Sequence, residues 1–476
     1  MEVQSKKRGE ELRAERKAHK KIIRRFVKER ALLENRIRAS EPLVIPARNN
    51  KTIDIRVFSV ALVIQSMISF RSTPIILKSF LDKGFDAINW IPHFTSVINW
   101  TLRMGLGLLS RVSSIIEPWI AIVDFSFDKG MTKILLILRV KLRVLGEKGA
   151  ALSAEDCECI GLHIGNNWKG ADVHKALTKT FAQSGRPTAI LKDQGSDLGL
   201  GVRLLNRSGS KIQIIDDITH VVANALKKDF GKRKIFSKFM EAVSAGAERL
   251  RQTSYSAFIP PSLRKKGRFQ SIARLISWAQ DLIPFFEGQG RHARGSLKEK
   301  LFKAFPRFLL FKTFINEFFN TTAVTDEFQK ILKHEGLNQR VYQDAKKILE
   351  RLPNKSKTRI ILQKWLRKHI RVQCLLGIAQ TPLPVSSDII ESLFGKFKIL
   401  IQKHPRSDLN RMALAIPTIC GRRSEDDLSE ALDSISHKTL KHWELQNIPM
   451  THRRARKLTF FNNNHVQKLG IKSGDG

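Results

Sequence analysis

Cysteine is scarce in this chain, with four residues among 476. So few cysteines cannot form the disulfide framework of an extracellular protein of this length, so we expect reduced thiols and an intracellular protein. Only one residue separates Cys157 from Cys159, which is too close for the usual structural zinc spacing. His163 and His174 follow nearby. A zinc site is therefore disfavoured.

Long apolar segments are missing as well. The longest runs, 57–68 and 134–138, are shorter than the roughly 20 residues that span a bilayer. The first 21 residues are charged throughout and lack the apolar centre of a secretory signal. We expect a cytoplasmic protein associated with the nucleoid, or a nuclear one if the host has a nucleus, with no membrane partner.

Acidic residues are also in short supply. Asp plus Glu number 44 against 84 Lys plus Arg, which gives a formal net charge of +40. A polycation of this strength binds polyanions, and double-stranded DNA is the leading candidate because each neutralised phosphate releases counterions. Hydrophobic residues make up 42% of the chain, so a sizeable core and several folding units are expected.

The N-terminal quarter predicts a basic arm followed by short helices. Residues 1–56 form the arm, and its first 40 residues carry 14 Lys/Arg against 6 Asp/Glu, which suits either a solvated helix or a DNA-contacting one. Residues 57–114 predict three helices, at 57–70, 74–81 and 96–104, the last capped by Thr95 and stopped by Gly105. This spacing suits a helix-turn-helix-like DNA-binding region, although generic three-helix modules share it.

From residue 115 to 230 the pattern is α/β. Apolar runs predict strands, and helical periodicity separates the later ones, in the order strand, strand, strand, helix, strand, helix, strand, helix. The expected strands are 119–127, 133–142, 157–164, 187–192 and 211–215, and the expected helices are 171–183, 196–206 and 217–230. Beyond them we expect an α-helical insertion at 231–385, further helices at 386–450, and a basic tail at 451–476.

Two aspartates stand where this pattern places strand ends. Asp124 interrupts the apolar run of the first strand, and a buried carboxylate there costs several kcal/mol unless it is paired or binds a metal. Asp193 ends the fourth strand, and ligands of open α/β sheets bind beyond the carboxyl ends of strands. Asp193 also suits a turn before Gly195, and Asp197 is a rival for the same role.

A third acid lies on a late helix. Glu391 flanks an apolar stripe formed by Ile389, Ile390, Leu393, Phe394 and Phe397, and Gly395 lies one turn further along the same side. The carboxylate of such an acid can lie at the edge of the buried face, where Gly395 leaves room for a ligand. Asp388 and Glu391 could instead be the N-cap and N3 residues of an ordinary helix.

Taken together, the three acids give residues 115–400 a resemblance to DDE-type transposases of insertion-sequence-like mobile elements. The resemblance implies an RNase H-like core, that is, a mixed five-stranded sheet flanked by helices and interrupted by an all-α insertion, behind an N-terminal helical DNA-binding region. It also implies that Asp124, Asp193 and Glu391 are the catalytic, metal-binding acids. Asp217 and His220 match an accessory motif of members with a helical insertion, and also suit an N-cap and N3 pair.

The resemblance further implies two Mg²⁺ or Mn²⁺ ions, a fitting choice for carboxylate oxygens, and metal-dependent DNA cleavage at element ends followed by strand transfer into target DNA. The partners would be element-end and target DNA, bound by a homodimer or higher oligomer. A non-catalytic DNA-binding protein derived from a transposase, and an RNase H-like nuclease without strand transfer, are the alternatives. Tyr255 and Tyr342 lack a nearby His-rich motif, which disfavours a tyrosine recombinase or relaxase.

Overall fold

The chain divides into two compact units, residues 1–53 and 54–476, each described by itself. The structure is a computed structural model. It describes residues 19–20, 23–31, 54–83, 88, 90–129, 132–209, 211–263, 268–287, 295–377, 381–401, 411–448 and 459–460, without the side chains of 126–129 and 268. In the first unit, residues 23–31 are helical. Most of the predicted basic arm, and the predicted tail except 459–460, lie outside the described residues.

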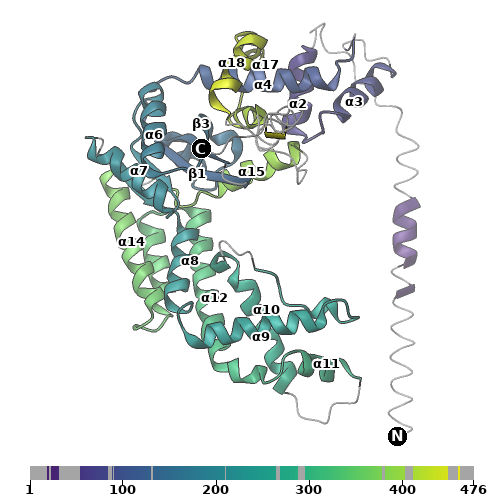
Figure 1. Cartoon of the computed structure of the whole chain (residues 1–476), viewed down its shortest axis with the longest axis vertical. Helices are drawn as coiled ribbons and strands as arrows, with labels where there is room; N and C mark the ends of the chain where they lie inside the picture. The colour runs from purple at the N-terminus through teal and green to yellow at the C-terminus, as the bar shows by residue number, and fades with distance from the viewer. Residues whose placement is uncertain are drawn as a thin grey trace, which may run out of the picture. The chain divides into compact units, whose positions relative to one another are not determined.

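A five-stranded mixed sheet forms the centre of the second unit (Figure 1). Its strands are β1 (Trp119–Lys129), β2 (Thr132–Lys141), β3 (Glu158–Asn166), β4 (Ala189–Lys192) and β5 (Gln213–Asp216). Their order across the sheet is β3-β2-β1-β4-β5. The first three strands are antiparallel neighbours, whereas β4 and β5 run parallel to β1. This is the sheet of an RNase H-like fold, and the predicted α/β class is confirmed.

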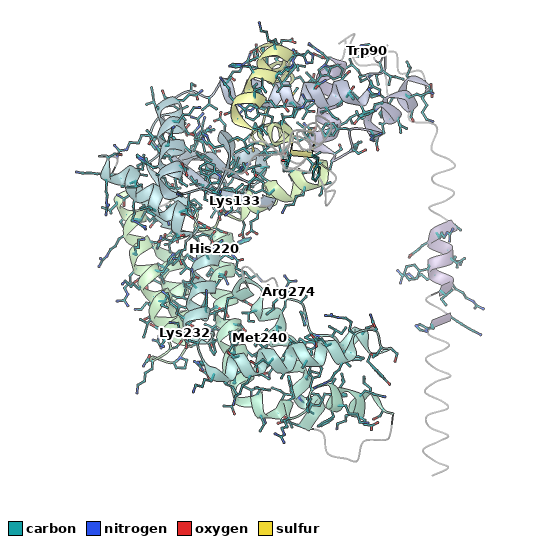
Figure 2. All side chains as sticks on the ribbon, viewed as in Figure 1. Trp90, Lys133, His220, Lys232, Met240 and Arg274 are labelled. Carbon is teal, nitrogen blue, oxygen red and sulfur yellow. The ribbon has the colours of Figure 1, made fainter. Side chains whose placement is uncertain are left out.

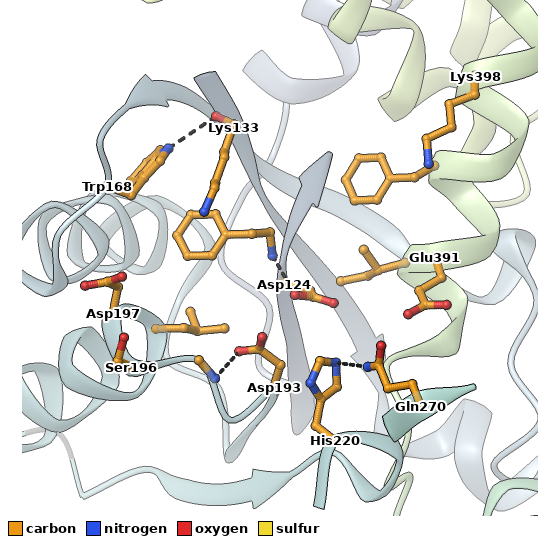
Figure 3. Close-up of a pocket in the computed structure, with 15 residues that line it drawn as sticks. Asp124, Lys133, Trp168, Asp193, Ser196, Asp197, His220, Gln270, Glu391 and Lys398 are labelled. Atoms are coloured by element: carbon orange, nitrogen blue, oxygen red, sulfur yellow. Dashed lines mark hydrogen bonds between the residues drawn. The ribbon is translucent and has the colours of Figure 1, made fainter. Parts of the chain in front are cut away.

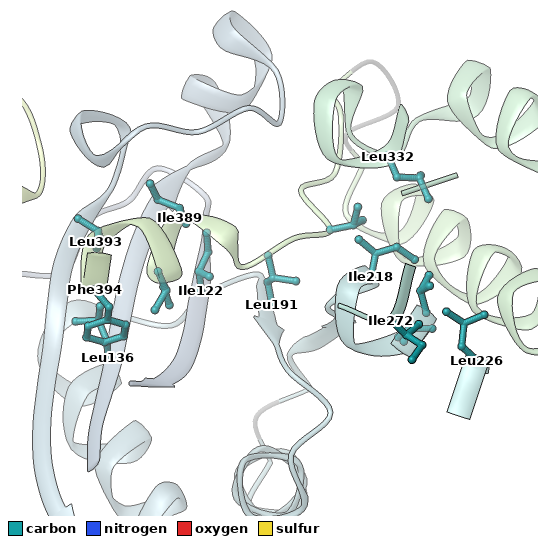
Figure 4. Packing of buried hydrophobic residues seen from close by; sticks show 14 of the residues in the cluster. Ile122, Leu136, Leu191, Ile218, Leu226, Ile272, Leu332, Ile389, Leu393 and Phe394 are labelled. Carbon is teal, nitrogen blue, oxygen red and sulfur yellow. The ribbon is translucent and has the colours of Figure 1, made fainter. Parts of the chain in front are cut away.

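Alternating side chains of the strands enter two different cores, as the period of two in a β-strand requires. On one face, Ala121 and Val123 of β1 pack with residues of α6 (Gly170–Ser184) and α7 (Ser196–Arg207). On the other face, Ile122 packs with Leu136 and with Leu393 of α15 (Asp388–Leu400), as Figure 4 shows. The sheet is therefore covered on both sides.

Among the described residues, six α-helices separate β5 and α8 from α15, in the region predicted to be a helical insertion. They are α9 (Lys234–Leu250), α10 (Ile272–Glu287), α11 (Leu297–Ala304), α12 (Lys312–Glu335), α13 (Gln339–Glu350) and α14 (Lys357–Leu375). Trp278 packs edge-on against Phe305 and Phe308, so it belongs to the core of this region. In the described part of the chain, no helix is long and apolar enough to cross a membrane.

The insertion is joined to the sheet through α8 (Ile218–Asp229) and α14. Asp229 at the end of α8 accepts hydrogen bonds from the backbone N–H and hydroxyl of Thr358, both at 3.0 Å. The ring of His369 accepts the backbone N–H of Asp216 at 3.0 Å, and the Trp365 indole donates to the Asp216 carbonyl at 3.0 Å. Side chains of α14 thus satisfy both backbone groups of Asp216 at the end of the edge strand β5, which makes them unavailable to another strand.

The helices before the sheet differ from the prediction. They are α2 (Ile55–Gln65), α3 (Ser72–Leu81) and α4 (Phe94–Ser110), and α4 is capped by His93 rather than Thr95. The first predicted helix ends five residues early, before Met67 adopts a left-handed φ of 54°. The predicted stop at Gly105 is wrong, because α4 continues to Ser110. A Cβ at position 105 would lie 1.7 Å from the carbonyl oxygen of Leu414. That glycine permits close packing instead of ending the helix.

This packing concerns the helix expected to read DNA. α4 contacts α16 (Ala415–Ile419) and α17 (Glu425–Asp433), and no residue from Val97 to Leu109 is exposed, whereas His93 and Thr95 at its start are exposed. A recognition helix contacts bases through its N-terminal residues. The helix-turn-helix-like DNA-binding region predicted for residues 57–114 stays a prediction. A further helix, α18 (His437–Asn447), follows α17.

Candidate active site

The register of the sheet places two of the predicted acids side by side. Val123 of β1 is the parallel partner of Lys192 of β4. The next residues along the chain are Asp124, inside β1, and Asp193, directly after β4, so the two acids lie next to each other where β4 ends. Asp193 is held in a turn, because its Oδ1 accepts the backbone N–H of Gly195 at 2.9 Å. The turn role suggested by the sequence and the site role therefore coexist.

The third acid reaches the same region from α15. This helix packs on β1 through buried Ile390, Leu393 and Phe394, as the apolar stripe predicted. Ser387, not Asp388, is the N-cap, and Asp388 forms an ion pair with Lys333 at 2.7 Å. Glu391 lies in the first turn on the rim of the packed stripe.

A pocket of about 530 Å³ brings the three acids together (Figure 3). Asp124, Asp193 and Glu391 all line it, and in the close-up Asp193 and Glu391 lie on either side of Asp124. The walls come from distant sequence regions, among them the early strands, the β4–α7 turn, and α15 more than 190 residues later, with Trp168, His220 and Gln270 in addition. Only the folded chain assembles this site.

Asp124 is the most strongly perturbed group in the pocket. Its carboxylate is buried and accepts the backbone N–H of Phe125 at 2.7 Å. Burial, and after it the negative charges of Asp193, Asp217 and Glu391, raise the pKa of Asp124 well above its ordinary value. Among the described residues, no Lys, Arg or His side chain forms an ion pair with it.

Asp193 rather than Asp197 faces this carboxylate. Asp193 contributes to the raised pKa of Asp124, whereas Asp197 lies exposed in the first turn of α7. In Figure 3, Asp197 lies on the far side of the pocket from Glu391, beside Ser196. The geometry therefore favours Asp193 as the partner of Asp124.

Of the two residues of the predicted accessory motif, Asp217 and His220, only His220 lines the pocket. Asp217 is buried and is the N-cap of α8, where its Oδ1 accepts the backbone N–H of His220 at 3.0 Å. Its Oδ2 accepts both the backbone N–H and the hydroxyl of Ser387, at 2.6 Å and 2.8 Å. Both oxygens are thus engaged, and Asp217 lines no part of the pocket. The His220 ring does line it, 3.3 Å from the side-chain nitrogen of Gln270.

Seven further residues of the pocket were not singled out from the sequence: Phe125, Lys133, Trp168, Ser196, Leu198, Gln270 and Lys398. The Trp168 ring packs 5.4 Å from that of Phe125, and its indole donates to the Lys133 carbonyl at 3.2 Å. Figure 2 labels Lys133 and His220, which lie on different elements, and both line the pocket together with the acids. A Lys on a strand and a Trp in a turn have no sequence signal that marks them for a site.

The donor set fits a hard divalent cation, since carboxylate oxygens are the ligands that Mg²⁺ and Mn²⁺ prefer. The buried, cation-free Asp124 supports this fit, because a bound ion would relieve its unfavourable charge. In the described part of the chain, however, no three His, Cys, Asp or Glu side chains are close enough to hold one ion. This covers the three acids as well as Cys157, Cys159, His163 and His174.

The fold and the pocket together define an α/β protein with a carboxylate-lined site at the carboxyl edge of an RNase H-like sheet. No protein-family model and no curated protein matches the sequence. Among solved structures, the chain is similar to the Drosophila P element transposase strand transfer complex, at 12% identity and a TM-score of 0.37. That match covers 83% of this chain and 94% of the other. At this level of similarity no residue role can be carried from one chain to the other.

Proposed function

We propose that this protein is a DDE-type transposase that cleaves DNA at the ends of a mobile element and joins them to target DNA. The observation that carries the proposal is the convergence of Asp124, Asp193 and Glu391 in one pocket, with Asp124 buried and without a cationic partner among the described residues. A cluster of acids in a chain of net charge +40 opposes binding of a polyanion unless it holds metal ions. The acids are therefore expected to serve chemistry.

In this proposal the three acids hold two Mg²⁺ or Mn²⁺ ions, which would activate an attacking oxygen and stabilise the leaving oxygen. Water attacks a phosphorus at the element end, the bond from phosphorus to the 3′ oxygen breaks, and a 3′-hydroxyl is released. That hydroxyl then attacks a phosphorus of the target and displaces a target 3′ oxygen. One phosphodiester replaces another, so no oxidant or covalent protein intermediate is needed.

The remaining residues of the pocket have supporting roles in this scheme. Asp217 holds the start of α15 and so positions Glu391 one turn later. Lys133 and Lys398 line the pocket and would attract phosphate to it. The aromatic rings of Phe125 and Trp168 form an apolar wall beside Asp124, which limits water on that side.

The test uses supercoiled plasmid that carries the DNA flanking the gene on both sides. Wild-type protein should yield nicked and joined products with Mg²⁺ or Mn²⁺ and none with Ca²⁺, whose larger coordination shell misplaces the reacting oxygens. Asp124→Asn, Asp193→Asn and Glu391→Gln should abolish both products and leave binding in a gel shift intact or tighter. Asp197→Asn is the matched control and should keep activity.

Two outcomes would contradict the scheme. Full cleavage by the Asp124→Asn protein would refute the mechanism. Loss of cleavage in Asp197→Asn but not in Asp193→Asn would show that Asp197, not Asp193, is the second metal-binding acid. Cleavage without joining would support the nuclease alternative, and binding without cleavage would support a non-catalytic DNA-binding protein.

A further inference from the structure

The helix α14 carries charge of one sign only. Its 19 residues include six Lys or Arg and no Asp or Glu. The neighbouring helices of the insertion mix both signs, since α13 contains Asp344 and Glu350, and α12 contains four acidic residues. Like charges three or four residues apart on a helix destabilise it, so α14 retains an arrangement that its own folding does not favour.

The basic residues of α14 occupy its outer face. The inner face packs on α8, α13 and β5 through residues such as Leu362 and Leu366, and Figure 1 shows α14 beside α8. Lys357, Lys364, Arg367, Lys368 and Arg371 are exposed. We call these five residues the α14 stripe. From its first to its last member the stripe extends about 21 Å along the helix, at about 1.5 Å per residue.

Most of the stripe has no acidic partner among the described residues. Lys368 forms an ion pair with Asp216 at 2.7 Å, but no ion pair of the described part of the chain involves Lys364, Arg367 or Arg371. These three follow one another at helical spacings of three and four residues, so their side chains lie along one side of the helix. The uncompensated charge is therefore concentrated in a line.

The stripe passes the same edge of the sheet that bears the acids. Asp216, the partner of Lys368, ends β5 and pairs with Lys192, which in turn pairs with Val123 next to Asp124. Two strand spacings, or about 10 Å, thus separate the backbone at Asp216 from the backbone at Val123. DNA that enters the pocket would therefore have phosphates near α14.

We propose that the α14 stripe binds the sugar-phosphate backbone of double-stranded DNA. This inference deepens the proposed function, because it assigns a surface to the DNA on which that function acts. A duplex carries one phosphate per strand about every 3.4 Å, so the roughly 10 Å from Lys364 to Arg371 can face about three phosphates of one strand. The contacts are to the backbone, so they add affinity without reading sequence.

The first test measures duplex binding by fluorescence anisotropy in EDTA at several salt concentrations, so that cleavage does not contribute. In full-length protein, the triple variant Lys364→Gln, Arg367→Gln, Arg371→Gln should reduce the slope of log affinity against log salt by about 2 to 3, at roughly 0.9 per phosphate contact. Affinity at low salt should fall by about tenfold or more. The matched control, Lys175→Gln, Lys179→Gln, Lys441→Gln, removes the same charge from exposed positions on α6 and α18 and should change the slope by less than about 1.

The second test uses a cysteine that the chain already provides. Cys374, one turn beyond Arg371, is exposed, whereas Cys157, Cys159 and Cys420 are buried. An iron–EDTA reagent attached to Cys374 should cut bound duplex by hydroxyl radicals, and the α14 triple variant should lose these cuts.

The outcomes separate the inference from the proposed function. Equal losses in the two triple variants, or a labelled protein that leaves bound duplex uncut, would overturn the α14 surface. Polyglutamate that competes as well as duplex at equal charge would assign the stripe to an acidic protein and also overturn it. An Asp124→Asn protein that binds duplex with the wild-type slope but fails to cut leaves the inference standing, whereas a wild-type protein that binds but never cuts removes only the catalytic proposal.

Discussion

Asp217 and Ser387 are 170 residues apart in sequence, yet the Asp217 carboxylate accepts both the backbone N–H and the hydroxyl of Ser387. This pair fastens the first turn of α8 to the first turn of α15, which carries Glu391. The same carboxylate caps α8 through the backbone N–H of His220. One buried aspartate therefore orients two helices that border the pocket.

Asp217→Ala should lower the free energy of unfolding by about 3 kcal/mol, because it leaves three buried donors without an acceptor. Ser387→Ala removes only the hydroxyl bond and should cost about 1 kcal/mol. Urea unfolding in EDTA measures both, and exposed Asp197→Ala, expected within about 0.5 kcal/mol of wild type, is the control. An Asp217→Ala protein of normal stability would contradict the positioning role and favour a direct role in the pocket.

Asp124→Asn should raise the free energy of unfolding of the metal-free protein. The folded pKa of Asp124 is raised by burial and then by the neighbouring acids, so the unfolded state loses its proton first as pH rises. The destabilisation of wild type by Asp124 is absent below the ordinary carboxyl pKa, and it grows as the pH rises from there to the pKa of Asp124 in the folded state. Urea unfolding of both proteins from acid to neutral pH should therefore show a gap that widens with pH.

With Mg²⁺ bound, the wild-type protein should have a larger free energy of unfolding than Asp124→Asn, the reverse of the order without metal. Binding to the folded state alone adds about 2.7 kcal/mol at a concentration 100 times Kd, and Asp124→Asn should lose most of that gain. Thermal unfolding with increasing Mg²⁺ measures it, and Asp197→Asn should respond as wild type does. Equal Mg²⁺ stabilisation of all three proteins would show that the ion binds elsewhere.

Two helical glycines should respond to alanine with opposite signs. A Cβ at Gly107 would lie 2.0 Å from the carbonyl oxygen of Ala431, whereas one at Gly395 meets nothing within 4 Å. Gly107→Ala should cost about 3 kcal/mol or more by overpacking α4 against α17. Gly395→Ala should gain about 0.5 to 1 kcal/mol from helix propensity. Chemical denaturation tests both, and a tolerated Gly107→Ala would show that α4 and α17 do not pack as closely as described.

His369 should make stability depend on pH between neutral and mildly acidic conditions. Its ring is buried, donates to the Trp365 carbonyl at 2.7 Å and accepts the Asp216 N–H, and burial lowers its pKa to about 4 from 6.5. Below 6.5 the unfolded state takes up a proton that the folded state refuses, so stability falls as pH drops from 6.5 towards 4, by about 3 kcal/mol.

Unfolding of His369→Asn at pH 7 and pH 5 should show a smaller pH effect than wild type, whatever its stability at pH 7. The exposed His437→Asn should retain the wild-type difference. An unchanged pH effect in His369→Asn would mean that this ring is charged in the folded state.

Local pattern sufficed for the elements of the sheet. Strands such as β1 and β4 consist of apolar runs bounded by polar turns, and their period of two separates Ile122 from Val123 onto opposite faces. The spacing of the apolar stripe of α15 likewise predicts that Glu391 lies at the edge of a buried face, where it is found. These features depend on neighbours a few residues away, which the sequence contains directly.

Contacts between distant segments decided the rest. From the sequence, Gly105 predicts a helix stop, but α4 continues through it, and the carbonyl of Leu414, more than 300 residues later, lies beside it. The partner of Asp217 and the membership of Lys133, Trp168 and Gln270 in the pocket depend on the same long-range packing. The sequence by itself determined the strands, the helical insertion and the three candidate acids. Only the tertiary structure decided which side chains surround those acids, because burial and proximity arise when remote helices pack together.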